Sequence, residues 1–197
     1  ATFVRWYNGH PDFRDLNPDL NISSAAVIGV GNVAIDISRL LCLSVEELST
    51  TDLPDYAETA IRQSQLSNVH MIGRRGPTDA KFTNVELREL GEMAECAPQV
   101  RSEQLPDGIE GDYPDRDKRL NERNLETLRQ YSERSAEDKP KRILFEFFAS
   151  PAEILGDDRV KGIRMERTQV EDGRAIGTGD YFDIPCGLVI SAIGYRG

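Results

Sequence analysis

The spacing of hydrophobic residues changes near the start of the chain, and the change predicts a strand followed by a helix. Residues 25–28 are apolar throughout, which is typical of a short buried strand. A glycine-containing turn follows. Apolar residues then recur at the spacing of a helix, at Val33, Ile37, Leu40 and Leu41. Residues 25–43 therefore indicate one strand–turn–helix unit.

Apolar runs later in the chain predict further strands. Residues 68–73 and 142–148 each favour one strand. Three stretches separated by Gly and Asp residues favour an antiparallel meander: 151–155, 160–170 and 181–184. The last run, residues 187–194, is apolar on both faces, and we expect it to be a central strand of a parallel sheet.

Helix signals lie between these strands. Asp52 is expected to cap a second helix that has Pro54 in its first turn and ends near residue 64. Thr83 and Glu86 match a capping box, which opens a third helix and by itself accounts for Glu86.

Two segments lack a clear period. Residues 2–20 mix aromatic residues with turn formers, which indicates an ordered linker or an arm covering the surface. Residues 97–140 are polar and charged, and we interpret them as a partly helical surface insertion. A helix over residues 116–134 would direct Leu120, Leu128 and Tyr131 inward.

The turn after the first strand has the spacing of a dinucleotide fingerprint, Gly29-x-Gly31-x-x-Ala34. Gly29 permits a tight turn, Gly31 lets a pyrophosphate approach the backbone, and Ala34 lets the helix pack closely on the strand. The first N–H groups of the helix and its dipole then favour phosphate. The alternative is a glycine turn without a ligand.

Two adjacent arginines, Arg74 and Arg75, follow the strand at residues 68–73. In folds that bind NAD, an acid near the end of the second strand binds the ribose hydroxyl of adenosine. A guanidinium instead matches a phosphate in charge and in shape. The pair therefore indicates the 2′-phosphate of NADP, and the alternative is a solvated basic turn.

Composition excludes several classes of function. The 197-residue chain has a net charge of −10, which argues against nucleic acid or an anionic membrane as its main partner. No apolar run approaches the roughly 20 residues of a membrane span. Cys42, Cys96 and Cys186 lie far apart, so we expect reduced thiols in a cytosol-like compartment, without a metal site or a redox-active disulfide.

These features together resemble a known family. The matching segments are Phe3-Val4-x-Trp6-Tyr7-Asn8-Gly9, residues 29–36, residues 73–77, Phe82-Thr83, residues 86–90 and residues 186–195. In this order they resemble adrenodoxin reductase and its bacterial ferredoxin–NADP reductase relatives. The match covers nearly the whole chain, and only residues 97–140 are hard to place.

The resemblance implies an α/β fold, with a Rossmann-like parallel sheet flanked by helices and an antiparallel β-meander. In that family an FAD domain is split around an NADP domain. FAD takes hydride from NADPH and passes electrons to a ferredoxin- or adrenodoxin-like iron–sulfur protein. The chain is then expected to be an NADP(H)-binding domain over residues 23–197. Residues 1–22 would be an arm from an absent FAD domain, so that this fragment alone is inactive.

The resemblance also implies roles for individual residues. The pyrophosphate would be held by Gly29, Val30, Gly31, Asn32 and Val33, and the 2′-phosphate by Arg74 and Arg75. Glu86 would lie near the nucleotide, and Asp36 and Glu89 would lie towards the flavin as candidate catalytic residues. Arg88 would dock the acidic iron–sulfur protein, together with basic residues over 116–123.

Two alternatives stay open. One is the NADPH domain of a flavoprotein like the small subunit of glutamate synthase, and the other is a stand-alone module that senses NADP. We expect a cytoplasmic location for a bacterial protein, or the mitochondrial matrix for a eukaryotic one.

Overall fold

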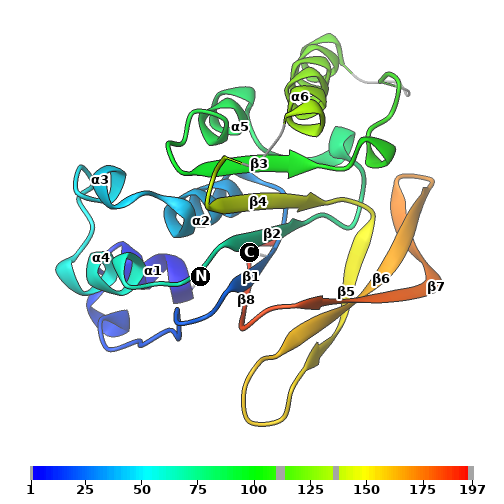
Figure 1. Ribbon diagram of the computed structural model, residues 1–197. Helices are drawn as coiled ribbons and strands as arrows, with labels where there is room; N and C mark the ends of the chain where they lie inside the picture. The colour runs from blue at the N-terminus through cyan, green and yellow to red at the C-terminus, as the bar shows by residue number, and fades with distance from the viewer. Residues whose placement is uncertain (1, 110–113, 135–137, 195–197) are drawn as a thin grey trace.

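The core of the fold is a parallel sheet, seen here in a computed structural model that describes residues 2–109, 114–134 and 138–194. Within these residues the sheet has five strands, which lie in the order β3-β4-β2-β1-β8 (Figure 1). Their bounds are β1 (Ser24–Ile28), β2 (Asn68–Ile72), β3 (Cys96–Val100), β4 (Lys141–Glu146) and β8 (Leu188–Ser191). All the pairings are parallel, so the carboxyl ends of the strands share one edge.

One face of this sheet carries the main core. Helices that contribute to it include α2 (Asn32–Cys42), α5 (Asn84–Leu90) and α6 (Asp115–Glu133). Val27 and Met71 of the sheet point into this cluster and are completely buried, and they pack with helix residues such as Leu41, Leu87 and Leu128. Of the apolar positions predicted at helical spacing in α2, Ile37, Leu40 and Leu41 are buried in this core, whereas Val33 is exposed.

The opposite face is partly covered by a second sheet. Its strands β5 (Ala149–Leu155), β6 (Gly162–Glu171) and β7 (Arg174–Pro185) are antiparallel. Because side chains alternate along a strand, Ala26 and Ile72 point away from the main core and pack with Ile163 and Met165 of β6. The expected α/β fold with an antiparallel meander is confirmed.

The predicted central position of the last strand is wrong, because β8 lies at an edge and pairs only with β1. Its apolar pattern has another cause. Leu188 and Ile190 contact the main core, while Val189 contacts the cluster under the antiparallel sheet. An edge strand that is covered on both faces therefore has the same pattern as a central one.

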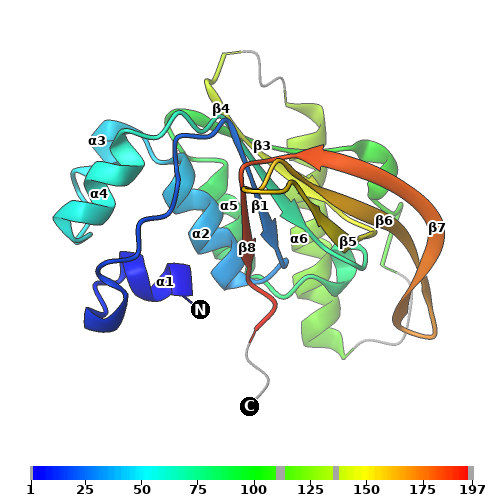
Figure 2. The ribbon, with the colours of Figure 1, turned by 90° about the horizontal axis from the view of Figure 1, so that it is seen from below.

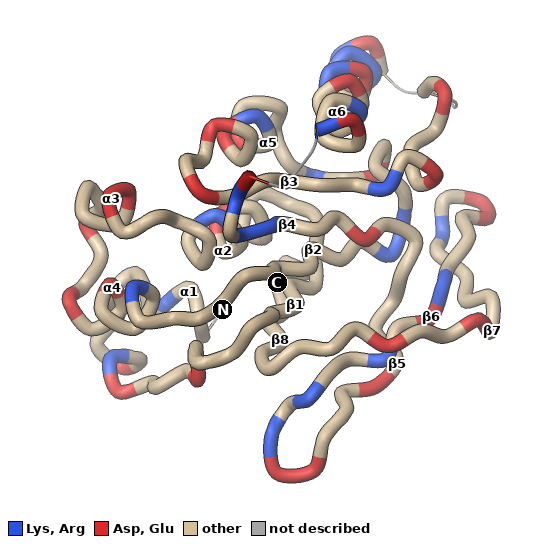
Figure 3. The backbone as a smooth tube through the Cα atoms, in the orientation of Figure 1, with Lys and Arg blue, Asp and Glu red and all other residues tan. Residues whose placement is uncertain are grey.

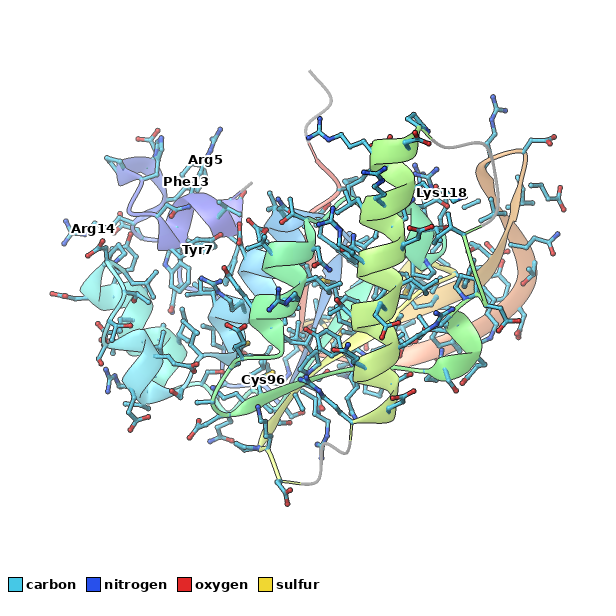
Figure 4. All side chains as sticks on the ribbon, turned by 90° about the horizontal axis from the view of Figure 1, so that it is seen from above. Arg5, Tyr7, Phe13, Arg14, Cys96 and Lys118 are labelled. Carbon is cyan, nitrogen blue, oxygen red and sulfur yellow. The ribbon has the colours of Figure 1, made fainter. Side chains whose placement is uncertain are left out.

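The N-terminal arm is part of the core rather than a covering loop. It forms α1 (Thr2–Tyr7) and a 3₁₀ turn, η1 (Pro11–Phe13), and Trp6 is only 1% exposed. The guanidinium of Arg5 lies 5.3 Å from the centre of the Phe13 ring (Figure 4). Helices α1 and α4 (Asp55–Arg62) lie at the same end of the molecule (Figures 1 and 2), and the Tyr56 hydroxyl donates a hydrogen bond to the Trp6 carbonyl.

The connection between β1 and β2 differs from the prediction in two details. Helix α4 begins after Pro54, which is its N-cap, so Asp52 does not cap it. A short helix, α3 (Val45–Leu48), precedes it, and a capping box between Ser44 and Glu47 stabilises the start of α3. The connection therefore contains two helices, of which α4 corresponds to the predicted second helix.

Residues 97–140 contribute more to the fold than a surface insertion would. They supply most of the edge strand β3. This strand contains Pro98, and proline argues against a central strand because it has no N–H to donate to a neighbouring strand. Helix α6 then packs on β3 and α5, with Leu125, Leu128 and Tyr131 buried. The predicted helix is confirmed, and the missed strand is explained by its proline.

We predict that Trp6→Ala lowers the free energy of unfolding by about 3–5 kcal/mol, because it leaves a cavity in the core. Urea denaturation measures this loss. Leu16→Ala is the matched control, since Leu16 lies in the same arm and is 37% exposed. If Trp6→Ala lowers the free energy of unfolding no more than Leu16→Ala does, Trp6 does not belong to the core.

Candidate nucleotide-binding site

The turn between β1 and α2 brings its backbone unusually close to another segment. Gly29 has a φ of +140°, and a Cβ atom there would lie 2.4 Å from the carbonyl oxygen of Ala192. The Gly29 N–H donates to the Ile72 carbonyl at the end of β2, and the Ala192 N–H donates to the Ile28 carbonyl. Only glycine fits this point, where the ends of three strands meet.

The N-terminus of α2 is open at this turn. Gly31 is its N-cap in an extended conformation, and no side chain caps the helix there. Ala34 is completely buried in the main core, and Val33 is 49% exposed. The first N–H groups and the helix dipole therefore provide the elements of an anion site at the carboxyl edge of the sheet.

A second loop lies against this turn. The Lys81 N–H donates to the Val30 carbonyl over 2.8 Å, and the Thr83 N–H donates to the side-chain oxygen of Asn32 over 2.9 Å. The side-chain oxygen of Asn32 thus holds the loop that leads to α5. This contact brings Glu86, in the first turn of α5, to the same side of the sheet as the fingerprint.

Glu86 forms only half of the predicted capping box. Its N–H donates to the Thr83 hydroxyl, but the Thr83 N–H donates to Asn32 and not to the Glu86 carboxylate. However, its Oε2 atom is buried and has no hydrogen-bond partner among the described residues. The N-cap bond therefore accounts for the backbone of Glu86 but not for its side chain, and the full capping box expected from the sequence is not formed. A buried acceptor without a partner is costly, so this oxygen is suited to a donor from a ligand.

The two arginines after β2 differ in their surroundings. Arg75 forms an ion pair with Asp79, with 2.9 Å between the two side chains, and donates a hydrogen bond to the Gly173 carbonyl. Arg74 is exposed, and its carbonyl accepts a hydrogen bond from the Thr168 hydroxyl. Asp79 lies four residues after Arg75, a spacing that in the sequence already indicates an ion pair. Arg74 is thus the arginine whose side chain faces solvent.

The loop after β2 that carries Arg74 and Arg75 (the arginine loop) lies beside the turn at residues 29–31 (the fingerprint turn). Gly73, at the end of β2, lies so close to Val30 that a Cβ atom would be 3.0 Å from both methyl groups of the valine. The structure therefore brings together the predicted residues of the fingerprint and of the arginine loop at one edge of the sheet.

A second group of charges lies between α2 and α5, where Arg39 forms an ion pair with Glu89. Partial burial raises the pKa of the Asp36 carboxyl above its usual value; Arg39 lowers it and the negative charge of Glu89 raises it further. Burial and the charge of Asp36 raise the pKa of Tyr7 to about 12. Asp36 and Glu89 thus interact, as candidates for one site should. Arg88, on α5, is exposed.

Other classes of site find no support in the described part of the chain. Cys42, Cys96 and Cys186 are all buried free thiols. Over residues 2–109, 114–134 and 138–194, no group of three or more His, Cys, Asp or Glu residues is placed to hold a metal ion. None of the helices in these ranges is long and apolar enough to cross a membrane.

Comparison with known proteins finds close relatives. NADPH-ferredoxin reductase FprA of Mycobacterium tuberculosis is 38% identical over 200 residues, which cover 99% of this chain and 44% of that protein. Human mitochondrial NADPH:adrenodoxin oxidoreductase is 38% identical over 208 residues, covering 98% and 42%. By sequence, this chain is similar over nearly its whole length to a part of these two reductases. No family model matches it.

The structures agree with this relationship. The structure of M. tuberculosis FprA in complex with NADPH superimposes with a TM-score of 0.92 at 37% identity, and covers 100% of this chain and 44% of that chain. The resemblance inferred from the sequence motifs is thus confirmed. The chain spans less than half the length of these members of the adrenodoxin reductase family.

We predict that Asp36→Asn raises stability at pH 7. The folded protein raises the pKa of Asp36, so it binds the proton of this carboxyl more tightly than the unfolded chain does. The stability that this tighter proton binding contributes is present below the ordinary pKa of about 3.9. It is lost as the pH rises through the raised pKa of Asp36. Thermal unfolding from pH 3 to 7 should show a gain for Asp36→Asn that vanishes at low pH.

The control is Asp157→Asn, at an exposed position in the β5–β6 loop, which should leave stability unchanged across this range. A gain for Asp36→Asn that stays constant down to pH 3 would contradict the assignment, because it would then not depend on the carboxylate charge.

Proposed function

We propose that this chain is the NADP(H)-binding domain of an FAD-dependent reductase, which passes electrons between NADPH and a ferredoxin- or adrenodoxin-type iron–sulfur protein. The observation that carries the proposal is the junction of two anion-binding elements at one sheet edge. These are the open N-terminus of α2 and the exposed Arg74. Residues 23–197 form this domain, and residues 1–22 are the arm that connects it to an FAD domain.

The fingerprint turn holds the pyrophosphate. Gly31 has no side chain, and the nearest atom to a Cβ built there is 3.9 Å away, on Lys81. A phosphate can therefore reach the N–H groups of Asn32 and Val33, and the positive end of the α2 dipole stabilises its charge. Lys81, beside this turn and exposed, adds a positive charge that the sequence analysis did not single out.

The arginine loop selects the 2′-phosphate. Arg74 reaches the phosphate from solvent, while Asp79 and the Gly173 carbonyl hold Arg75 in place. A phosphate carries nearly two negative charges, and a guanidinium can bind it through two hydrogen bonds. NAD lacks this phosphate, so the arginine loop adds no comparable binding free energy for NAD. We assign Glu86 to the nucleotide as well, because its unpaired Oε2 can accept a hydrogen bond from a ribose hydroxyl.

The chemistry of such a reductase takes place on a flavin. Bound FAD supplies the ring that accepts hydride from the nicotinamide. Asp36 and Glu89 face this side in the proposed reductase, and the ion pair between Arg39 and Glu89 fixes the carboxylate of Glu89. The chain by itself binds nucleotide without transferring electrons, because a flavin site lies outside the proposed domain. We place the reductase in the cytoplasm of a bacterium or in a mitochondrial matrix.

Docking of the iron–sulfur protein involves α5 and the first turns of α6. Arg88 is exposed on α5, and Figure 3 shows several basic residues along α6. They include Arg116, Lys118, Arg119 and Arg123, of which Lys118 is labelled in Figure 4. Acidic residues alternate with them on α6 (Figure 3), so the attraction for an acidic partner is local rather than a property of the whole chain.

We predict that Arg74→Ala weakens the binding of NADP by about one to two decades and leaves the binding of NAD nearly unchanged. A charge-assisted hydrogen bond contributes roughly 1.5–3 kcal/mol, and NAD lacks the phosphate that accepts it. Arg75→Ala should have a smaller effect, because Asp79 already neutralises Arg75. Calorimetric titration of both nucleotides measures the two affinities.

Arg62→Ala is the matched control, because Arg62 pairs with Glu58 on α4, outside the loops of the site. It should bind both nucleotides as the wild type does. The arginine loop has no role in cofactor choice if neither Arg74→Ala nor Arg75→Ala narrows the difference between NADP and NAD.

We predict that Arg88→Glu in the intact reductase slows reduction of the iron–sulfur protein, while reduction of a small dye stays unchanged. A charge at the rim of an interface mainly affects the association rate and its dependence on salt. Stopped-flow kinetics at several salt concentrations measure this. Arg159→Glu makes the same charge change in the exposed β5–β6 loop and should have no effect. Equal losses with protein and dye acceptors would exclude a docking role.

A further inference from the structure

Phe148 has a backbone conformation that large side chains rarely adopt. It lies between β4 and β5, and its φ is +54°, in the left-handed region. Its N–H donates to the Arg75 carbonyl over 3.3 Å, and its carbonyl accepts from the Thr168 N–H over 2.9 Å. A non-glycine residue in this region costs free energy, so the surrounding structure must impose it. Here the arginine loop on one side and β6 on the other hold Phe148 in place.

The ring of Phe148 is fitted to the arginine loop. A Cβ atom on Gly76 would lie 2.7 Å from the Cζ atom of the ring, so the loop needs glycine at this position. Thr168, which holds the Phe148 carbonyl, also donates its hydroxyl to the Arg74 carbonyl. Phe148 is thus linked through hydrogen bonds to the backbone of both arginines.

Phe148 also lines a cavity of about 350 Å³ at the carboxyl edge of the sheet. Other walls come from Arg101 and Gln104 after β3, and from Arg167 and Thr168 on β6. The Gln104 side chain donates to the Phe147 carbonyl and accepts from the Phe147 N–H. One wall is therefore fixed by hydrogen bonds, and the volume is within the usual range of ligand sites.

The charges around this cavity suit a neutral ligand. The Arg101 guanidinium is paired with Glu146 over 2.9 Å, and that of Arg167 is paired with Asp180 over 3.1 Å. Arg167 also lies 4.6 Å from the centre of the Phe182 ring. Both positive charges are thus locally compensated, unlike that of the exposed Arg74. A flat, uncharged aromatic group fits this surface better than a phosphate.

We propose that this cavity receives the purine base of NADP(H), with the base stacked on the ring of Phe148. The inference rests on the proposed function, in which Arg74 binds the 2′-phosphate. The base and this phosphate are attached to adjacent carbons of the same ribose, so the base must lie next to the arginine loop. Phe148 lies beside that loop and lines the cavity, and stacking on an aromatic ring needs no hydrogen bonds from the base.

The test uses this chain and adenosine 2′,5′-bisphosphate, a probe that carries the base and the 2′-phosphate without nicotinamide. Phe148→Leu keeps an apolar side chain but removes the aromatic face, and should weaken binding of the probe about tenfold or more. Gly76→Ala displaces the ring of Phe148 and should also weaken binding. Phe13→Leu is the matched control, in the N-terminal arm.

A direct measurement supplements the affinities and does not depend on the folding of a variant. In wild-type protein with labelled phenylalanine, the base protons of the bound probe should show nuclear Overhauser contacts to one phenylalanine ring. That signal should be absent in Phe148→Leu.

The outcomes separate this inference from the function on which it rests. If the probe binds and depends on Arg74, but not on Phe148, and shows no contact to a phenylalanine ring, the base lies elsewhere. The inference is then overturned and the proposed function stands. If wild-type protein fails to bind the probe at all, both are overturned. Tenfold weaker binding in Phe148→Leu, together with the ring contact, supports the inference.

Discussion

At Gly29 the backbone passes closer to a neighbouring segment than any side chain would allow. A Cβ atom there would overlap the carbonyl oxygen of Ala192, and φ is positive as well. Because of this close approach, β1 hydrogen-bonds at its end to both the end of β2 and the residue after β8. The open N-terminus of α2 and the loop of Arg74 thereby become neighbours. The candidate site depends on this packing, since each half of it alone is a common structural element.

The charge distribution explains how an acidic chain can bind an acidic cofactor. The net charge is −10, so the average field repels a dinucleotide phosphate. Two local groups attract phosphate in spite of this repulsion: the uncapped N-terminus of α2, through its dipole, and the side chain of Arg74. Several other arginines near the carboxyl edge are compensated by carboxylates, including Arg75 by Asp79 and Arg101 by Glu146. Uncompensated positive charge therefore occurs where we propose that phosphates bind.

Much of the fold followed from the sequence, because burial leaves an apolar run in β1 and apolar residues at helical spacing in α2. The errors have physical causes. Pro98 concealed β3, and packing on both faces made the edge strand β8 resemble a central one. Contacts between segments that are far apart in the sequence could not be predicted from the sequence either. The sequence singled out Arg74, Arg75 and the fingerprint glycines, which the structure places at one edge. The fit of Phe148 against Gly76 and the unpaired oxygen of Glu86 required coordinates.

Amide hydrogen exchange with and without nucleotide tests the central claim most directly, because it reports on each backbone segment of the site at once. The account predicts that NADP slows exchange in residues 30–34 and in residues 74–76. NAD should protect the first segment and leave the second nearly as exposed as in the free protein. Protection by NADP that is confined to other parts of the chain, or equal protection of residues 74–76 by both nucleotides, would contradict it.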